Sequence, residues 1–162
     1  MQFIVRGVPQ DVADEVRRTR RSPGYGHPAH LEVAAGTGPC RCCLRPFAPG
    51  KDQRLLFTYR PPGEGESLTA PGPVFIHAEH CDAWTGAGFP DALRALPLAF
   101  EARAAHSRVN ALSARADQTA EAQMRDLFDR DRAQWLHVRH AEAGCFIARV
   151  QKKGPEVSLG AQ

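Results

Sequence analysis

The chain has 162 residues, of which 43% are hydrophobic and 24% charged, a composition typical of a globular protein that buries a core without disulfide staples. Its net charge of +3 at pH 7, with the histidines neutral, is small for a dedicated nucleic-acid binder. No window approaches the roughly eighteen apolar residues of a membrane span, and the N-terminus carries no secretory signal, so we expect a cytoplasmic protein with reduced thiols.

The first part of the chain predicts short elements separated by many turns. Residues 2–6 have the composition of a strand, and residues 10–21 predict a helix because apolar residues recur four positions apart. Proline and glycine in residues 22–28 end that helix, and residues 30–36 form a possible short strand. Most of the 14 glycines and 13 prolines fall in the first ninety residues, which predicts a loop-rich front half.

The middle of the chain predicts strands. Residues 54–60 and 74–78 are rich in β-branched and aromatic side chains, and the loop 61–73 separates them. Residues 98–104 alternate as a strand does, and residues 110–116 are predicted to pair with them.

The last part of the chain predicts one helix and a hairpin. Residues 119–131 have helical spacing, with Thr119 or Asp117 as the N-cap. Residues 134–151 form two β-rich runs around a glycine-containing turn. We therefore predict an α+β fold built on a mostly antiparallel sheet with few helices, as a single domain over residues 1–151, followed by a flexible tail over residues 152–162.

The densest chemistry lies in two cysteine-containing stretches. Cys40 and Cys43 have the Cys-x2-Cys spacing with which a tight turn directs two sulfurs to one side. His77 and Cys81 stand four residues apart at the end of a predicted strand. Three thiolates and one imidazole form a donor set that tetrahedral Zn²⁺ accepts, so the sequence predicts a structural zinc site formed by these four residues.

Several alternatives to this ligand set remain. His80 could replace His77, and Cys42 is a spare thiol that is better explained as a neighbour than as a ligand. Cysteine is also a common buried apolar residue, which is the structural alternative for the whole cluster. A thioredoxin-like dithiol is disfavoured because prolines follow the cysteines where a helix would begin. Arg41 and Arg45 could offset the charge of a three-thiolate site.

Four motifs together resemble the bacterial domain of unknown function 1203 family. They are "GPCRCCLRPFAPG", "LLFTYRPP", "GPVFIHAEHC" and "LHVRHAEAGCFIARV", in this order along the chain. The resemblance extends over about residues 2 to 151. It implies a small single-domain bacterial protein with no established activity.

Cys145 is a second candidate for chemistry. A turn over residues 141–144 would place His140 and Cys145 opposite one another in the hairpin, where an imidazole can activate a thiol. No third group for such a pair is evident, and a buried strand cysteine is the favoured interpretation.

No residue is therefore assigned a catalytic role, and whether the protein is an enzyme stays open. We expect a non-catalytic binding or scaffold protein with a structural zinc site. The alternative is a thiol- or metal-dependent enzyme, redox or hydrolytic, that uses Cys145 with His140 or an open zinc site. The basic run 16–21 is more typical of a solvated helix face than of a phosphate-binding patch, so nucleic acid is not an expected partner.

Overall fold

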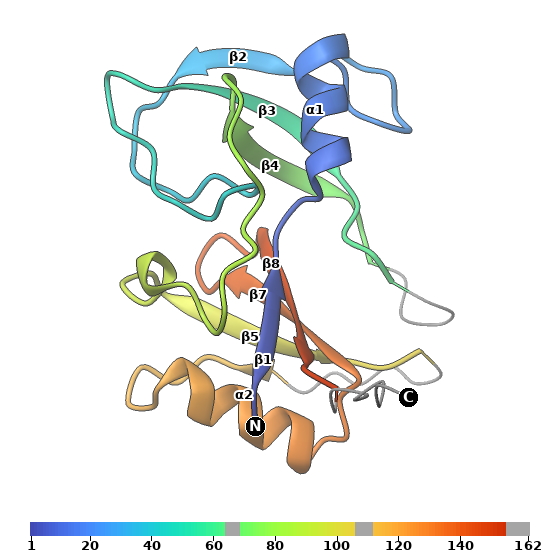
Figure 1. The fold of residues 1–162 in the computed structure, drawn as a ribbon, viewed down its shortest axis with the longest axis vertical. Helices are drawn as coiled ribbons and strands as arrows, with labels where there is room; N and C mark the ends of the chain where they lie inside the picture. The colour runs from blue at the N-terminus through green and yellow to red at the C-terminus, as the bar shows by residue number, and fades with distance from the viewer. Residues whose placement is uncertain (64–68, 106–111, 155–162) are drawn as a thin grey trace, which may run out of the picture.

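The computed structural model describes residues 1–63, 69–105 and 112–154, and the strands of these residues form two antiparallel sheets (Figure 1). The elements are β1 (Phe3–Arg6), α1 (Gln10–Thr19), β2 (His30–Val33), β3 (Gln53–Tyr59), β4 (Gly72–His77), the 3-10 helix η2 (Asp91–Leu93), β5 (Leu98–Arg103), β6 (Leu112–Ser113), α2 (Ala120–Asp129), β7 (Trp135–His140) and β8 (Phe146–Lys152).

The smaller sheet has the strand order β2-β3-β4 and shares a core with α1. Ala13 and Val16 are the buried residues of α1, and they belong to the same apolar cluster as Leu55 of β3 and Ile76 of β4. The cysteines of the turn around Cys40 also belong to this cluster. This sheet, α1 and the cysteine turn lie together in the upper part of Figure 1.

The larger sheet has the strand order β1-β8-β7-β5-β6, and α2 covers one of its faces. Met124, Leu127 and Phe128 of α2 pack with the inward residues of the strands, among them Phe100 and Leu136. Of the two residues predicted as the N-cap, Thr119 and Asp117, it is Thr119 that caps α2, because its side chain accepts a hydrogen bond from the amide of Ala122.

The chain passes between the two sheets where β1 leads into α1. At this point the amide of Val8 donates to the carbonyl of Arg41 over 2.7 Å. Gly7 lies against the same carbonyl, and a Cβ atom at this position would be only 2.0 Å from the oxygen of Arg41. The close approach therefore requires glycine.

The structure confirms the predicted α+β fold with mostly antiparallel strands, and it divides the strands between two sheets. β5 pairs with β7 along its whole length, from Leu98 with His140 to Arg103 with Trp135, and pairs with β6 only at Phe100 and Glu101. Of the predicted strand 110–116, residues 110–111 lie outside the described residues.

The two ends of the predicted domain lie side by side in the larger sheet. Lys152 pairs with Phe3 and ends β8, while residues 155–162 of the predicted tail lie outside the described residues. Among the helices of the described residues, none has the length and apolar character needed to cross a bilayer.

Candidate metal centre

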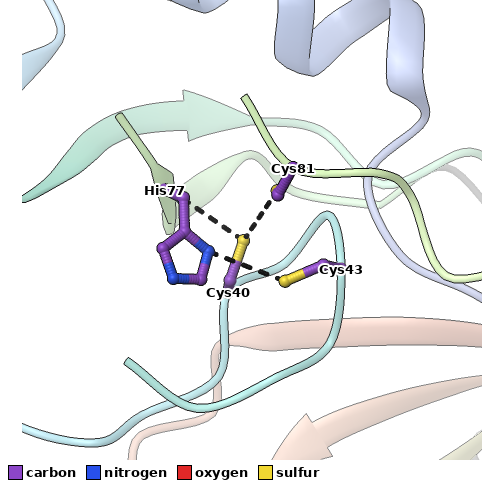
Figure 2. Close-up of side chains that lie close together, drawn as sticks. All are labelled: Cys40, Cys43, His77 and Cys81. Atoms are coloured by element: carbon purple, nitrogen blue, oxygen red, sulfur yellow. Dashed lines mark hydrogen bonds between the residues drawn. The ribbon is translucent and has the colours of Figure 1, made fainter. Parts of the chain in front are cut away.

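Cys40 and Cys43 lie on a tight turn between the two sheets. The amide of Leu44 donates to the carbonyl of Cys40 over 2.8 Å, and the amide of Cys40 donates to the carbonyl of Arg45 over 2.9 Å. Leu44 closes the turn with a φ of 59°, in the left-handed region that a bulky residue rarely adopts. Both cysteines are buried, with 0% and 2% exposure, and their thiols project from the same side of the turn (Figure 2).

His77 and Cys81 meet this turn from the end of β4. His77 is the last residue of the strand, and its amide donates to Sγ of Cys40 over 3.3 Å. The amide of Arg41 donates to the carbonyl of Phe75 over 2.8 Å, which fastens the turn to the strand. Cys81 follows in the loop after β4 and is half-buried.

The donor atoms of Cys40, Cys43, His77 and Cys81 all lie within 4.8 Å of one another. The sulfurs of Cys40 and Cys81 are 3.8 Å apart, and Sγ of Cys43 is 3.6 Å from Nδ1 of His77. Zinc–sulfur bonds of about 2.3 Å and zinc–nitrogen bonds of about 2.0–2.1 Å in a tetrahedron give about 3.8 Å between two sulfurs and about 3.6 Å between sulfur and nitrogen. The residues therefore fit a tetrahedral ion in donor chemistry and in these two separations.

The imidazole of His77 is oriented by a carboxylate on its far side. Its Nδ1 faces Cys43, while Nε2 lies 3.2 Å from Oδ2 of Asp52. The same carboxylate oxygen accepts a hydrogen bond from the amide of Ala48 over 2.8 Å, and this bond, followed by that to His77, lowers the pKa of Asp52. A carboxylate behind a histidine that ligates a metal fixes the ring's tautomer and orientation, and Asp52 is placed to do so here.

Arg17 of α1 contacts the site from outside the four donors. Its NH2 donates to Sγ of Cys81 over 3.0 Å, and its Nε donates to the carbonyl of His77 over 3.1 Å. The side chain is 10% exposed, whereas Arg18 and Arg20 of the same basic run are exposed. The interpretation of this run as a solvated face is therefore wrong for Arg17, which lies where it can offset the negative charge of three thiolates.

A second residue of α1 holds the loop that carries Cys81. Nε2 of Gln10 donates to the carbonyl of Cys81 over 3.2 Å, and Oε1 of Gln10 accepts from the amide of Ala83 over 2.7 Å. Neither Gln10 nor Arg17 is identified by the spacing of the cysteines, because both reach the site only through the packing of α1 on the smaller sheet.

Hydrogen bonds within the cluster shift the pKa values of Cys40 and Cys43 in opposite directions. Hydrogen bonds from Cys40 and then Cys81 lower the pKa of Cys43, with a smaller contribution from Arg45. The bond to Cys43 is also the main cause that raises the pKa of Cys40. The Cys40 thiol, aided by Asp52, raises the pKa of His77 to about 9. A metal ion requires a neutral imidazole and ionised thiols, so its binding would release protons from this cluster.

The alternative ligands lie outside the group of four donors. The side chain of His80 is 66% exposed, and its Nε2 lies 3.0 Å from a carboxylate oxygen of Asp82. Cys42 is fully buried and directs its thiol toward the carbonyl of Cys81, at 3.9 Å. Cys43, His77 and Cys81 line, together with His80, a depression of about 270 Å³ that is open to solvent.

The structure does not join Cys145 to the ring of His140. Nδ1 of His140 instead accepts a hydrogen bond from the amide of Ala143 within the turn, at 3.1 Å. The backbones of His140 and Cys145 do face one another, because the amide of His140 donates to the carbonyl of Cys145 over 3.0 Å. The thiol of Cys145 contacts Arg41, whose guanidinium is thus directed to Cys145 and not to the four donors.

Comparison with known protein families gave one match. The family model described as "Protein of unknown function (DUF1203)" matches residues 37–152, which include all four donors and Cys145. Neither the comparison with curated proteins nor that with solved structures gave a match.

Proposed function

The chain belongs to the DUF1203 family of proteins of unknown function, and we propose that it binds one structural zinc ion through Cys40, Cys43, His77 and Cys81. The observation that carries this proposal is the agreement of two separations, 3.8 Å between sulfurs and 3.6 Å between sulfur and nitrogen, with those of a tetrahedral site.

The surroundings of the four donors support the same assignment. Three thiolates around a divalent cation leave one negative charge, and the guanidinium of Arg17 lies 3.0 Å from one of the sulfurs. The carboxylate of Asp52 behind His77 provides the outer partner that histidine ligands of metals usually have. Soft sulfur with borderline nitrogen favours zinc, and iron is the other metal that accepts these donors.

The proposed role of the ion is structural. Four protein donors fill the coordination of Zn²⁺ and leave no position for a reactive water. The ion would tie the cysteine turn to the end of β4, so that two loops with little regular structure keep one arrangement. We accordingly propose a non-catalytic binding or scaffold role for the protein, and a cytoplasmic location, which its five free cysteines favour.

Elemental analysis of the purified protein tests the proposal. We expect about one zinc per chain, lost in Cys43→Ser and retained in Cys42→Ser, which alters a buried cysteine of the same turn outside the donor group. A content of one iron per chain would support the same ligand site but identify its metal as iron. A folded wild-type protein that holds no metal after expression and purification in zinc-containing medium would end the proposal.

A further inference from the structure

The sulfurs of Cys40 and Cys81 lie 3.8 Å apart, and the turn that carries Cys40 is fixed at this distance by its backbone (Figure 2). The amide of His77 donates to Sγ of Cys40 over 3.3 Å. The amide of the next residue, Arg41, donates to the carbonyl of Phe75 in β4 over 2.8 Å. The sulfur of Cys40 is therefore held against the end of β4.

Two side chains of α1 fix Cys81 from the opposite direction. Arg17 donates to its sulfur over 3.0 Å, and Gln10 bonds both the carbonyl of Cys81 and the amide of Ala83. All of these contacts are made by protein atoms, so the fold itself brings the two sulfurs together. Residues 80–86 have no regular secondary structure, and a small shift of this loop would bring the sulfurs to the bonded distance of about 2.0 Å.

The two sulfurs differ in their access to solvent. Cys40 is fully buried, whereas Cys81 is half-buried and lines the open depression of about 270 Å³. Cys43 lines the same depression but is only 2% exposed. A small oxidant that enters from solvent therefore meets the sulfur of Cys81 first, and Cys40 is placed to react with the product.

We propose that the candidate metal centre is a redox switch, in which hydrogen peroxide oxidises Cys81, a disulfide forms between Cys81 and Cys40, and the zinc ion is released. The inference rests on the proposed zinc site and adds its regulation. The disulfide removes two of the three sulfur ligands, and Cys43 with His77 cannot fill a tetrahedral coordination sphere. The new bond joins the same two segments as the ion, so we expect the oxidised protein to stay folded.

Hydrogen peroxide is the one reactant that must be supplied. The sulfur of Cys81 bonds to one peroxide oxygen, the oxygen–oxygen bond breaks, and a sulfenic acid and water result. The sulfur of Cys40 then bonds to the sulfur of Cys81, the sulfur–oxygen bond breaks, and a second water leaves. The two sulfurs lose two electrons in total, and the peroxide takes up two protons, from the thiols or, when both sulfurs begin as thiolates, from solvent.

The geometry favours Cys40 over the other thiols of the turn as the partner of Cys81. The sulfur of Cys42 contacts the carbonyl oxygen of Cys81, at 3.9 Å, and Cys42 is not one of the four grouped donors. The sulfur of Cys43 contacts the imidazole of His77. The sulfur of Cys40 contacts the sulfur of Cys81 itself, which is the atom that a sulfenic acid offers to a second thiol.

Treatment of the zinc-loaded full chain with hydrogen peroxide tests the proposal. A chromogenic chelator follows zinc release against a sample without peroxide, and peptide mapping without reductant locates the disulfide. We expect one zinc released for each Cys40–Cys81 disulfide, and zinc binding restored by reduction with a phosphine. Cys42→Ser, which removes a buried thiol of the same turn, and Cys145→Ser, which removes a thiol outside the site, should behave as wild type.

Cys43→Ser separates the disulfide from the zinc site. This variant should hold no zinc and still form the Cys40–Cys81 disulfide, because both sulfurs remain; if it does not fold, mapping of the wild type decides. Untreated wild type without zinc would contradict the proposed function. Zinc release accompanied by a different disulfide, or by a sulfinic acid on Cys81, would overturn only the switch. Zinc retention under conditions that oxidise free glutathione in a parallel reaction would also overturn it.

Discussion

The guanidinium of Arg17 donates a hydrogen bond to the sulfur of Cys81, 64 residues further along the chain. This bond joins the last turn of α1 to the loop after β4, and a bond from the same side chain to the carbonyl of His77 reinforces it. The helix therefore takes part in the candidate metal centre without supplying a ligand.

Replacing Arg17 should weaken metal retention. Arg17→Gln removes the cation beside Cys81, so a three-thiolate site would keep an uncompensated negative charge, and we expect about a tenfold loss of zinc affinity in competition with a chelator. Arg18→Gln is the matched control, because Arg18 is an exposed neighbour on the same helix. Equal affinities of the two variants would contradict a role for the bond to Cys81.

Asp52 is expected to affect zinc affinity through its contact with His77. Asp52→Asn removes the negative charge behind Nε2, and we expect zinc affinity to fall about tenfold or more, because the imidazole loses the partner that holds its tautomer. Asp82→Asn changes a carboxylate that pairs with exposed His80 and should leave affinity unchanged. Isothermal titration with zinc compares the two, and a larger effect of Asp82→Asn would show that His80 is the true ligand.

Gly7 should tolerate no side chain. In Gly7→Ala the new methyl group would overlap the carbonyl oxygen of Arg41, at 2.0 Å, so either the β1–α1 connection or the cysteine turn must move. We expect the free energy of unfolding in urea to fall by about 2–4 kcal/mol. Gly38→Ala is the control, since a Cβ there meets no atom within 4 Å, and its stability should stay within about 0.5 kcal/mol of wild type. A stable Gly7→Ala protein with full metal content would refute the packing argument.

His137 should make the protein acid-sensitive. The residue is fully buried on β7, and burial, followed by repulsion from Arg103, Arg139 and Arg149, lowers its pKa to about 3. The unfolded chain protonates its histidine near pH 6.5, so stability due to the neutral ring is complete above this pH and is lost progressively toward pH 3.

Urea unfolding at pH 7 and pH 5 measures this effect. Between these values the His137 contribution is at most about 2 kcal/mol, because each pH unit below 6.5 accounts for about 1.4 kcal/mol. His137→Leu should lose correspondingly less stability on acidification than wild type, and His80→Gln, which alters an exposed histidine, should follow wild type. If the free energy of unfolding falls equally on acidification in wild type and in His137→Leu, protonation of His137 does not cause the loss of stability at acid pH.

The four candidate ligands could be chosen from the sequence because their chemistry is local. Cys-x2-Cys defines a turn, and His77 and Cys81 follow the end of a strand, so only one tertiary contact between the two stretches had to be assumed. Arg17 and Asp52 were not identifiable in this way. Arg17 belongs to a basic run that resembles any solvated helix end, and Asp52 precedes β3 with no spacing that relates it to His77.

The division of the strands between two sheets could also not be predicted from the sequence. Alternation and β-propensity indicate that a segment is a strand, but they do not say which edge it joins. β1 is the first strand of the chain and pairs with β8, the last one described, whereas β2, β3 and β4 pair among themselves. Within residues 91–96 the structure forms only the three-residue helical turn η2, and Pro97, which would interrupt a longer helix, follows shortly after it.

Arg41 connects three parts of the molecule through atoms of a single residue. Its amide donates a hydrogen bond to Phe75 in the smaller sheet, and its carbonyl accepts one from Val8 in the connection between β1 and α1. Its guanidinium donates a hydrogen bond to Cys145 in the hairpin of β7 and β8. A displacement of one sheet against the other would therefore have to move or break at least one of these three contacts. The proposed zinc ligand Cys40 directly precedes Arg41, so loss of the proposed ion would loosen the turn on which all three contacts depend.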